Sequence, residues 1–167
     1  KNQSKIKQVT RKLELNDQKK IFTGPTGVPR TFAVIPLTPS ANVHDLLNGI
    51  YREIGSEFTP ETAGNPVYIE SFKQNVRFFT PNRTNLLEII DSVAAVDTII
   101  FVVSAQDESI DILGVDLLEV LRAQGMCTAI ACIQNLESAV KSAKQHDLKL
   151  SWLNSLTFHL ASTLHPR

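Results

Sequence analysis

Five segments of the chain have the apolar pattern of β-strands. Residues 31–37, 97–104 and 127–133 are continuous apolar runs rich in β-branched side chains, which predicts strands buried on both faces. Residues 67–72 and 75–80 are rich in β-forming side chains and are separated by only two residues. These two segments therefore predict a hairpin.

Helices are predicted between and after these strands, over residues 43–54, 84–94, 110–124 and 136–164. Asn42 is placed to cap the start of the first helix, and Gly125 to end the third. One face of the third helix is expected to be apolar, with Ile110, Leu113, Leu117 and Leu121. A break is expected in the last helix near residues 146–147.

Strands that alternate with helices predict an α/β fold with a mostly parallel sheet covered on both sides. The hairpin at 67–80 adds one antiparallel edge strand. The order β-α-β-β-α-β-α-β-α is that of a Ras-like or translation-GTPase-like core. A flavodoxin-like receiver is the main rival, but it lacks the hairpin. Ligands of such sheets bind at the carboxyl ends of the strands.

A separate segment precedes this domain. Residues 1–22 contain no Gly or Pro and predict a helix, whose apolar positions Ile6, Val9 and Leu13 form a seam beside the lysines. Residues 23–30 predict a linker because glycine and proline alternate there. We therefore expect a basic helix at 1–22, a linker at 23–30 and a globular domain at 31–167. The chain starts at Lys1, and its single methionine is Met126, so a piece of a longer multidomain protein is expected.

The net charge of zero conceals an asymmetry along the 167 residues. Residues 1–30 carry eight basic and two acidic side chains, a balance of +6, and residues 31–167 carry a balance of −6. A basic arm on an acidic body suggests a polyanion as the partner of the arm. A merely solvated helix or tail explains the same charges equally well. No apolar run approaches the roughly 18–20 residues of a membrane span.

The two cysteines, Cys127 and Cys132, lie five residues apart in one apolar run. On a strand this spacing points their side chains to opposite faces, which excludes a disulfide between them. Reduced thiols in the core of an intracellular protein are expected.

The turn after the first strand lacks the residues that bind phosphate. A GTPase has G-x-x-x-x-G-K-[ST] there, so that backbone N–H groups and a lysine surround the phosphates. Residues 36–43 (PLTPSANV) contain neither glycine nor lysine, and Pro36 and Pro39 each remove a backbone donor. Thr38, Ser40 and Asn42 are the polar side chains left in this turn, and an anion bound weakly at the helix start is a minor alternative.

The other two GTPase motifs are degenerate as well. Residues 80–83 (TPNR) stand where D-x-x-G would support Mg²⁺ and contact the γ-phosphate. Residues 135–138 (NLES) stand where N-K-x-D would read guanine, and only Asn135 matches. Asn135 is either a remnant of that motif or a simple helix-capping residue. The expected vestigial nucleotide site is therefore Thr38, Ser40, Asn42 and Asn135, with no catalytic residue, cofactor or metal.

Other candidates for chemistry are weak. Asp107, Glu108 and Asp111 could act as paired carboxylates, but at a helix start they more simply complement the helix dipole. The four histidines do not have zinc-ligand spacing with the cysteines. Trp152 and Phe158 in the last helix are expected to pack rather than to stack on bases.

Two segments resemble a known family. Residues 95–104 (AVDTIIFVVS) resemble its "VADxxxF" strand, and residues 117–136 (LLEVLRAQGMCTAIACIQNL) resemble its following helix, "QG" turn and strand ending in "NL". A strand at 32–37 after a basic helix and a glycine-containing linker also fits. The chain thus resembles the GTPase-like domain of the Bms/Tsr family of small-subunit ribosome-assembly factors. The Tsr branch (twenty-S rRNA accumulation factor) is closer, because the Bms branch keeps a phosphate-binding loop.

This resemblance implies a non-hydrolysing factor on late precursors of the small ribosomal subunit, which keeps translation factors and the large subunit away. β-Barrel domains would follow this domain. The implied partners are small-subunit ribosomal RNA, ribosomal proteins and other assembly factors, with no membrane and no small-molecule substrate. The implied location is the nucleolus, the nucleus and the cytoplasm. Ribosomal RNA contact by the basic helix would fall on Lys1, Lys5, Lys7, Arg11, Lys12, Lys19 and Lys20.

Two other functions remain open from the sequence. One is a divergent GTPase that binds nucleotide without a standard loop. The other is a Ras-like or receiver-like module for protein interaction with no role in RNA binding.

Overall fold

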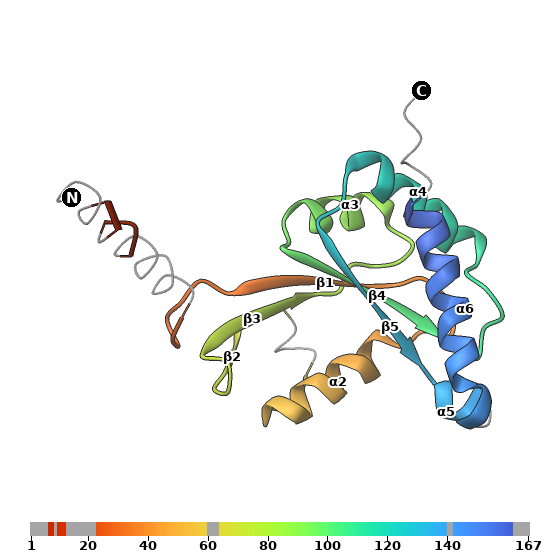
Figure 1. Ribbon diagram of the computed structural model, residues 1–167, viewed down its shortest axis with the longest axis horizontal. Coiled ribbons are helices and arrows are strands. Elements are labelled where there is room, and N and C mark those ends of the chain that lie inside the picture. The colour runs from red at the N-terminus through yellow and green to blue at the C-terminus, as the bar shows by residue number, and fades with distance from the viewer. Residues whose placement is uncertain (1–6, 9, 13–22, 60–63, 140–141, 162–167) are drawn as a thin grey trace.

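The computed structural model describes residues 7–8, 10–12, 23–59, 64–139 and 142–161. A five-stranded sheet in the order β2-β3-β1-β4-β5 forms its centre (Figure 1). The parallel strands are β1 (Arg30–Pro36), β3 (Gln74–Phe79), β4 (Thr98–Ser104) and β5 (Thr128–Gln134). The edge strand β2 (Val67–Ile69) pairs antiparallel with β3. The predicted α/β fold with one antiparallel edge hairpin is confirmed.

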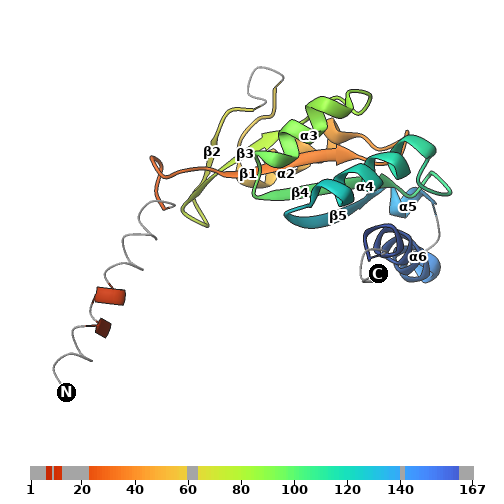
Figure 2. The ribbon, with the colours of Figure 1, turned by 90° about the horizontal axis from the view of Figure 1, so that it is seen from above.

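Helices cover both faces of the sheet. Figure 1 shows α2 (Val43–Ile54) on one side of the strands and α3 (Leu86–Ala94) and α4 (Ile112–Gln124) on the other. The short α5 (Leu136–Ala139) leads to α6 (Ser142–Ala161), which packs on α4 and lies at the β5 end of the sheet (Figure 2).

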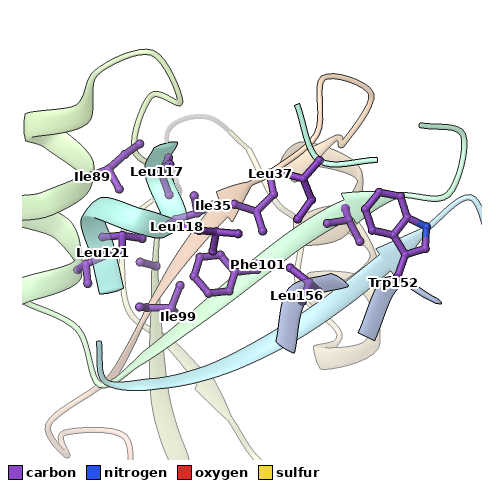
Figure 3. Packing of buried hydrophobic residues seen from close by; sticks show 14 residues of the cluster. Ile35, Leu37, Ile89, Ile99, Phe101, Leu117, Leu118, Leu121, Trp152 and Leu156 are labelled. Carbon is purple, nitrogen blue, oxygen red and sulfur yellow. The ribbon is translucent and has the colours of Figure 1, made fainter. Parts of the chain in front are cut away.

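The core has two layers because β1 and β4 are buried on both faces. On one face, Ile35 and Phe101 pack with apolar residues of α3, α4 and α6, including Leu118 and Trp152 (Figure 3). On the other face, Val34 and Val102 pack with apolar residues of α2 and β3. The position of β1 and β4 at the centre explains their unbroken apolar sequences.

Side-chain caps fix where the helices begin. Asn42, Asn85 and Asp111 each accept a hydrogen bond from the backbone N–H three residues on, at the starts of α2, α3 and α4. Helix α2 ends at Ile54, and Gly55 caps it with a left-handed φ of 79°. The predicted bounds 43–54 for this helix, its Asn42 cap and the end of α4 at Gly125 are confirmed.

The prediction that the last strand is buried was wrong. Among the described residues, strand β5 pairs only with β4, and residues 128–131 of this strand are exposed. Cys127 lies before the strand and is exposed, so it is not a core thiol. Cys132 is partly buried against the α2 side of the core, and burial raises the pKa of its thiol. An apolar run alone does not distinguish a central strand from an edge strand.

Details of the helices also differ from the sequence prediction. Leu113 is exposed, because α4 starts at Ile112 and turns Gly114, Leu117, Leu118 and Leu121 toward the core. Residues 146–147 lie inside α6, so no break occurs there. Trp152 is buried as expected, whereas Phe158 is exposed and does not pack in the core.

Candidate functional site

The carboxyl ends of four parallel strands meet at one edge of the sheet. The turn 36–42 follows β1, Arg83 follows β3, residues 104–111 follow β4, and Asn135 follows β5. In sheets of this kind this edge holds the ligand. The predicted site residues Thr38, Ser40, Asn42 and Asn135 all lie in these segments.

A carboxylate of the protein occupies the turn before α2. The backbone N–H of Ser40 donates to one Asp107 oxygen at 3.1 Å, and the Ser40 hydroxyl donates to the other at 2.8 Å. In phosphate-binding turns the backbone N–H groups point at the anion in this way. Asp107 therefore takes the acceptor role that a bound phosphate has at such a turn.

The charge of Asp107 is stabilised where it lies. Burial raises the pKa of this carboxyl, but hydrogen bonds from the Ser40 and Thr38 side chains and from the Ser40 N–H, together with the positive charge of the nearby Arg83 guanidinium, outweigh that effect. Together they hold the pKa of Asp107 below its ordinary value. The group is therefore an anion at neutral pH, as a phosphate would be.

The next two N–H groups of the turn are also used within the protein. Ala41 N–H donates to the Thr38 carbonyl at 3.2 Å. Asn42 N–H donates to Gln134 Oε1 at 2.8 Å, and Gln134 Nε2 donates back to the Asn42 carbonyl at 2.8 Å. The backbone N–H groups of Ser40, Ala41 and Asn42 thus all donate to acceptors within the chain. A ligand would have to displace these hydrogen bonds in order to accept from them.

Thr38 and Asn135 both form hydrogen bonds with Ser104 at the end of β4. Thr38 is buried, and its hydroxyl accepts the Ser104 N–H at 2.9 Å. Asn135 has the left-handed φ of 58° and donates from Nδ2 to the Ser104 hydroxyl at 3.1 Å. Asn135 therefore binds the end of β4 and is not aimed at a ligand.

Arg83, which follows β3, connects the end of β1 to the start of α4. Its Nε donates to the Pro36 carbonyl at 3.1 Å and its Nη2 to the Leu37 carbonyl at 3.1 Å. The same Nη2 pairs with the carboxylate of Asp111, which also caps α4. This arginine stands in the segment where a GTPase has D-x-x-G, and here it fastens the first turn to α4.

Helix α4 approaches the first turn so closely that only glycine fits at position 114. A Cβ there would lie 2.3 Å from the Leu37 carbonyl oxygen and 2.6 Å from a side-chain carbon of Ile110. Both distances are shorter than any ordinary contact. Gly114 therefore permits the close packing between α4 and the end of β1.

Hydrogen-bonding groups of the protein itself therefore occupy the carboxyl ends of the strands. The four polar remnants lie at this edge as the sequence predicts, whereas no sequence pattern indicates Asp107 and Gln134 as acceptors or Arg83 as a residue that links the strand ends. Of the three carboxylates predicted to complement a helix start, Asp111 caps α4, whereas Asp107 lies before that helix and accepts hydrogen bonds from Ser40 instead. Among the described residues, no group of three or more His, Cys, Asp or Glu side chains could hold a metal ion.

Only part of the predicted RNA-binding set can be located. Lys7, Arg11 and Lys12 lie in helical turns and are exposed. Lys1, Lys5, Lys19 and Lys20 lie outside the described residues.

Hydrogen bonds hold the backbone of residues 24–27 on the domain. Asn75, which is buried, donates from Nδ2 to the carbonyls of Gly24, Pro25 and Gly27 at 3.3, 3.0 and 2.8 Å. Gly24 N–H donates to the Lys73 carbonyl at 2.9 Å. The start of β3 thereby fixes the position of residues 24–27 on the sheet.

A hollow of about 600 Å³ lies away from the strand ends, between α2 and the β2–β3 turn. Its lining is mainly apolar, with Leu46, Ile50, Ile69 and Phe72. It contains none of the clustered hydrogen-bonding groups of the strand ends. We therefore do not place the chemistry of the protein there.

In the described part of the chain, no helix is long and apolar enough to span a bilayer.

Comparison with known proteins finds a matching family model and a similar yeast protein. Residues 30–165 match the family model described as "Tsr1, G-like domain". The chain is also similar to "Ribosome biogenesis protein tsr1" of the fission yeast Schizosaccharomyces pombe, with 25% identity over 162 residues. That alignment covers 94% of this chain and 20% of the yeast protein, so the chain spans about a fifth of the length of this relative.

Proposed function

Because the chain belongs to the family of the Tsr1 G-like domain, we propose that it acts in ribosome biogenesis as a non-catalytic assembly factor. The proposal combines a closed strand-end site with an RNA-binding arm. The matched relative is named for ribosome biogenesis, which supports the general role.

One observation supports the non-catalytic half above all others. The N–H and hydroxyl of Ser40 both donate to the Asp107 carboxylate, so an internal anion holds the turn that would otherwise cradle phosphate. Arg83 fills the neighbouring segment with hydrogen bonds to the Pro36 and Leu37 carbonyls. A nucleotide would have to displace these bonds and would meet no lysine in their place. The domain therefore works as a fixed shape and not as a hydrolase.

The basic arm supports the RNA-binding half. Residues 1–30 have a balance of +6, whereas the rest of the chain has −6, so attraction to a polyanion is concentrated in the arm. Lys7, Arg11 and Lys12 are exposed, as phosphate contacts require. We assign RNA binding to these three and to Lys1, Lys5, Lys19 and Lys20. The arm at 1–22, the linker at 23–30 and the domain at 31–167 are separate parts of this proposal.

Occupancy is the mechanism we propose. The arm binds precursor RNA of the small subunit, and the acidic body covers a surface that translation factors or the large subunit would use. Ribosomal proteins and other assembly factors are the neighbours in this scheme. The protein would travel with the precursor from the nucleolus and nucleus to the cytoplasm.

Salt-dependent RNA binding tests the arm. Affinity for transcribed small-subunit precursor RNA is measured at several salt concentrations for the chain and for Lys7→Glu/Arg11→Glu/Lys12→Glu. Each lost phosphate contact reduces the slope of log K against log salt by about 0.7–0.9, so the triple variant should bind at least tenfold more weakly with a slope reduced by about 2–3.

A matched control applies the same charge change to the body. Arg52, Lys144 and Lys149 are exposed on α2 and α6, and reversing all three should alter RNA affinity much less than the arm variant does. Equal losses in the two triple variants, or no loss in the arm variant, would refute the RNA role of the arm.

A further inference from the structure

Exposed apolar side chains gather where α3 and α4 begin. Of the ten large apolar side chains exposed in the described part of the chain, four lie in these two first turns. They are Leu86, 42% exposed, Leu87, 73%, Ile112, 82%, and Leu113, 40%. Single exposed apolar residues are common on protein surfaces, but groups of them mark sites of interaction.

An ion pair and a helix contact link the two first turns to each other. The Arg83 guanidinium, three residues before Leu86, pairs with Asp111, which immediately precedes Ile112. Helices α3 and α4 also contact each other and lie on the same side of the sheet, as Figures 1 and 2 both show. We call the exposed residues of these first turns, Leu86, Leu87, Ile112 and Leu113, the α3–α4 apolar surface.

Carboxylates continue this surface along both helices. Asp91 lies four residues after Leu87, and Asp116 lies four residues after Ile112, so each pair shares a helix face. Glu88 and Glu119 add two more exposed carboxylates to the same helices. Helix α3 has no basic residue, and the single one in α4, Arg122, donates to the His159 carbonyl. The surroundings of the apolar surface are therefore acidic.

This combination selects one kind of occupant. A nucleic acid or an anionic membrane would be repelled by the carboxylates, and the same surface of a second copy would bring identical carboxylates against them. A lysine- and arginine-rich polypeptide with one or two large apolar side chains complements both features. We infer that the α3–α4 apolar surface binds a basic segment of a partner protein, separately from the RNA that we assign to the arm.

Site-specific crosslinking in cells tests the inference. A photoreactive amino acid replaces Leu87 or Ile112, in turn, in the protein as the cell makes it, and the crosslinked peptides are identified by mass spectrometry. A third variant carries the same group at Phe158, which is also exposed but lies on α6. The inference predicts crosslinks from positions 87 and 112 to a Lys/Arg-rich segment of another protein, at yields several-fold above those from position 158.

Charge reversal separates this contact from adventitious apolar contact. The double variant Asp91→Lys/Asp116→Lys should reduce the crosslink yield from position 87 at least threefold, and a second variant, Asp147→Lys on α6, should leave it unchanged. Crosslinks chiefly to RNA, to the protein's own chain or to a second copy would overturn the inference. So would yields no higher than those at position 158, or yields that do not respond to the charge reversal.

Discussion

At the residue scale, Asp107 connects the end of β4 to the turn before α2 through both of its oxygens. Asp107→Ala removes the acceptor for the Ser40 N–H and hydroxyl. We expect a decrease in the free energy of unfolding of about 1–2 kcal/mol in urea, since these are hydrogen bonds to a charged group at a partly exposed position. The neighbouring Glu108 is exposed, and Glu108→Ala should change the free energy of unfolding by less than about 0.5 kcal/mol.

Removing the internal anion should also open the turn to an external one. Inorganic phosphate should therefore raise the unfolding temperature of Asp107→Ala more than that of the unchanged chain. If phosphate shifts both proteins equally, and Asp107→Ala unfolds like Glu108→Ala, then Asp107 does not serve as a substitute for a ligand.

Two carboxylates make stability depend on pH in a defined direction. Backbone hydrogen bonding from Thr31 is the main reason that the pKa of Asp97 is lowered, and the pKa of Asp107 is lowered as well. In the unfolded chain both groups titrate near about 3.9, so their stabilising effect is present above that pH and is lost as the pH falls through the folded-state values.

The double variant Asp97→Asn/Asp107→Asn should therefore differ from the unchanged chain most between about pH 5 and 7, and the difference should shrink below about pH 4. Urea unfolding at several pH values measures it. A difference that grows on acidification would mean that these carboxylates are not preferentially ionised in the folded state.

Individual residues of the strand-end site were only partly predictable. The loss of glycine and lysine in residues 36–43 and the arginine at 83 are visible in the sequence. The pairings that close the site join residues far apart in the chain, such as Ser40 with Asp107 and Asn42 with Gln134. No local pattern encodes such partners, because they depend on how the strand ends meet.

At the element scale, the close contact of α4 with the end of β1 makes two glycines respond oppositely to the same change. Gly114→Ala places a Cβ 2.3 Å from the Leu37 carbonyl and should destabilise the fold by about 2–3 kcal/mol despite the better helix propensity of alanine. Gly49 lies inside α2 with open space where a Cβ would go, so Gly49→Ala should stabilise the fold by up to about 1 kcal/mol.

Thermal or urea unfolding of the two variants makes the comparison. Similar effects of the two changes, in either direction, would mean that the packing of α4 on the first turn does not limit residue size at position 114.

Elements were predicted well where their signals are local. Caps and glycine stops gave the bounds of α2 correctly, and the unbroken apolar run at β4 correctly indicated burial on both faces. The same kind of apolar run at β5 led to a wrong prediction of burial, because the burial of a strand depends on which other elements cover it. The covering elements depend on how the whole sheet assembles, so the sequence of a seven-residue strand does not indicate them.

At the scale of the whole molecule, the charge separation assigns different partners to different surfaces. Residues 1–30, which contain the arm, hold the positive balance of +6, and the remaining residues hold −6. We place RNA on the arm, a basic protein segment on the α3–α4 apolar surface and no ligand at the strand ends. A nucleotide hydrolase would instead require the strand ends to be open.

Titration of the chain with a fluorescent GTP analogue, with and without Mg²⁺, decides whether the strand ends are closed to nucleotide. Because Ser40 and Asn42 already donate to Asp107 and Gln134, we expect no saturable binding up to about millimolar concentration. Saturable, Mg²⁺-dependent binding with a micromolar Kd would contradict a closed site and would restore the divergent GTPase as the better explanation of this domain.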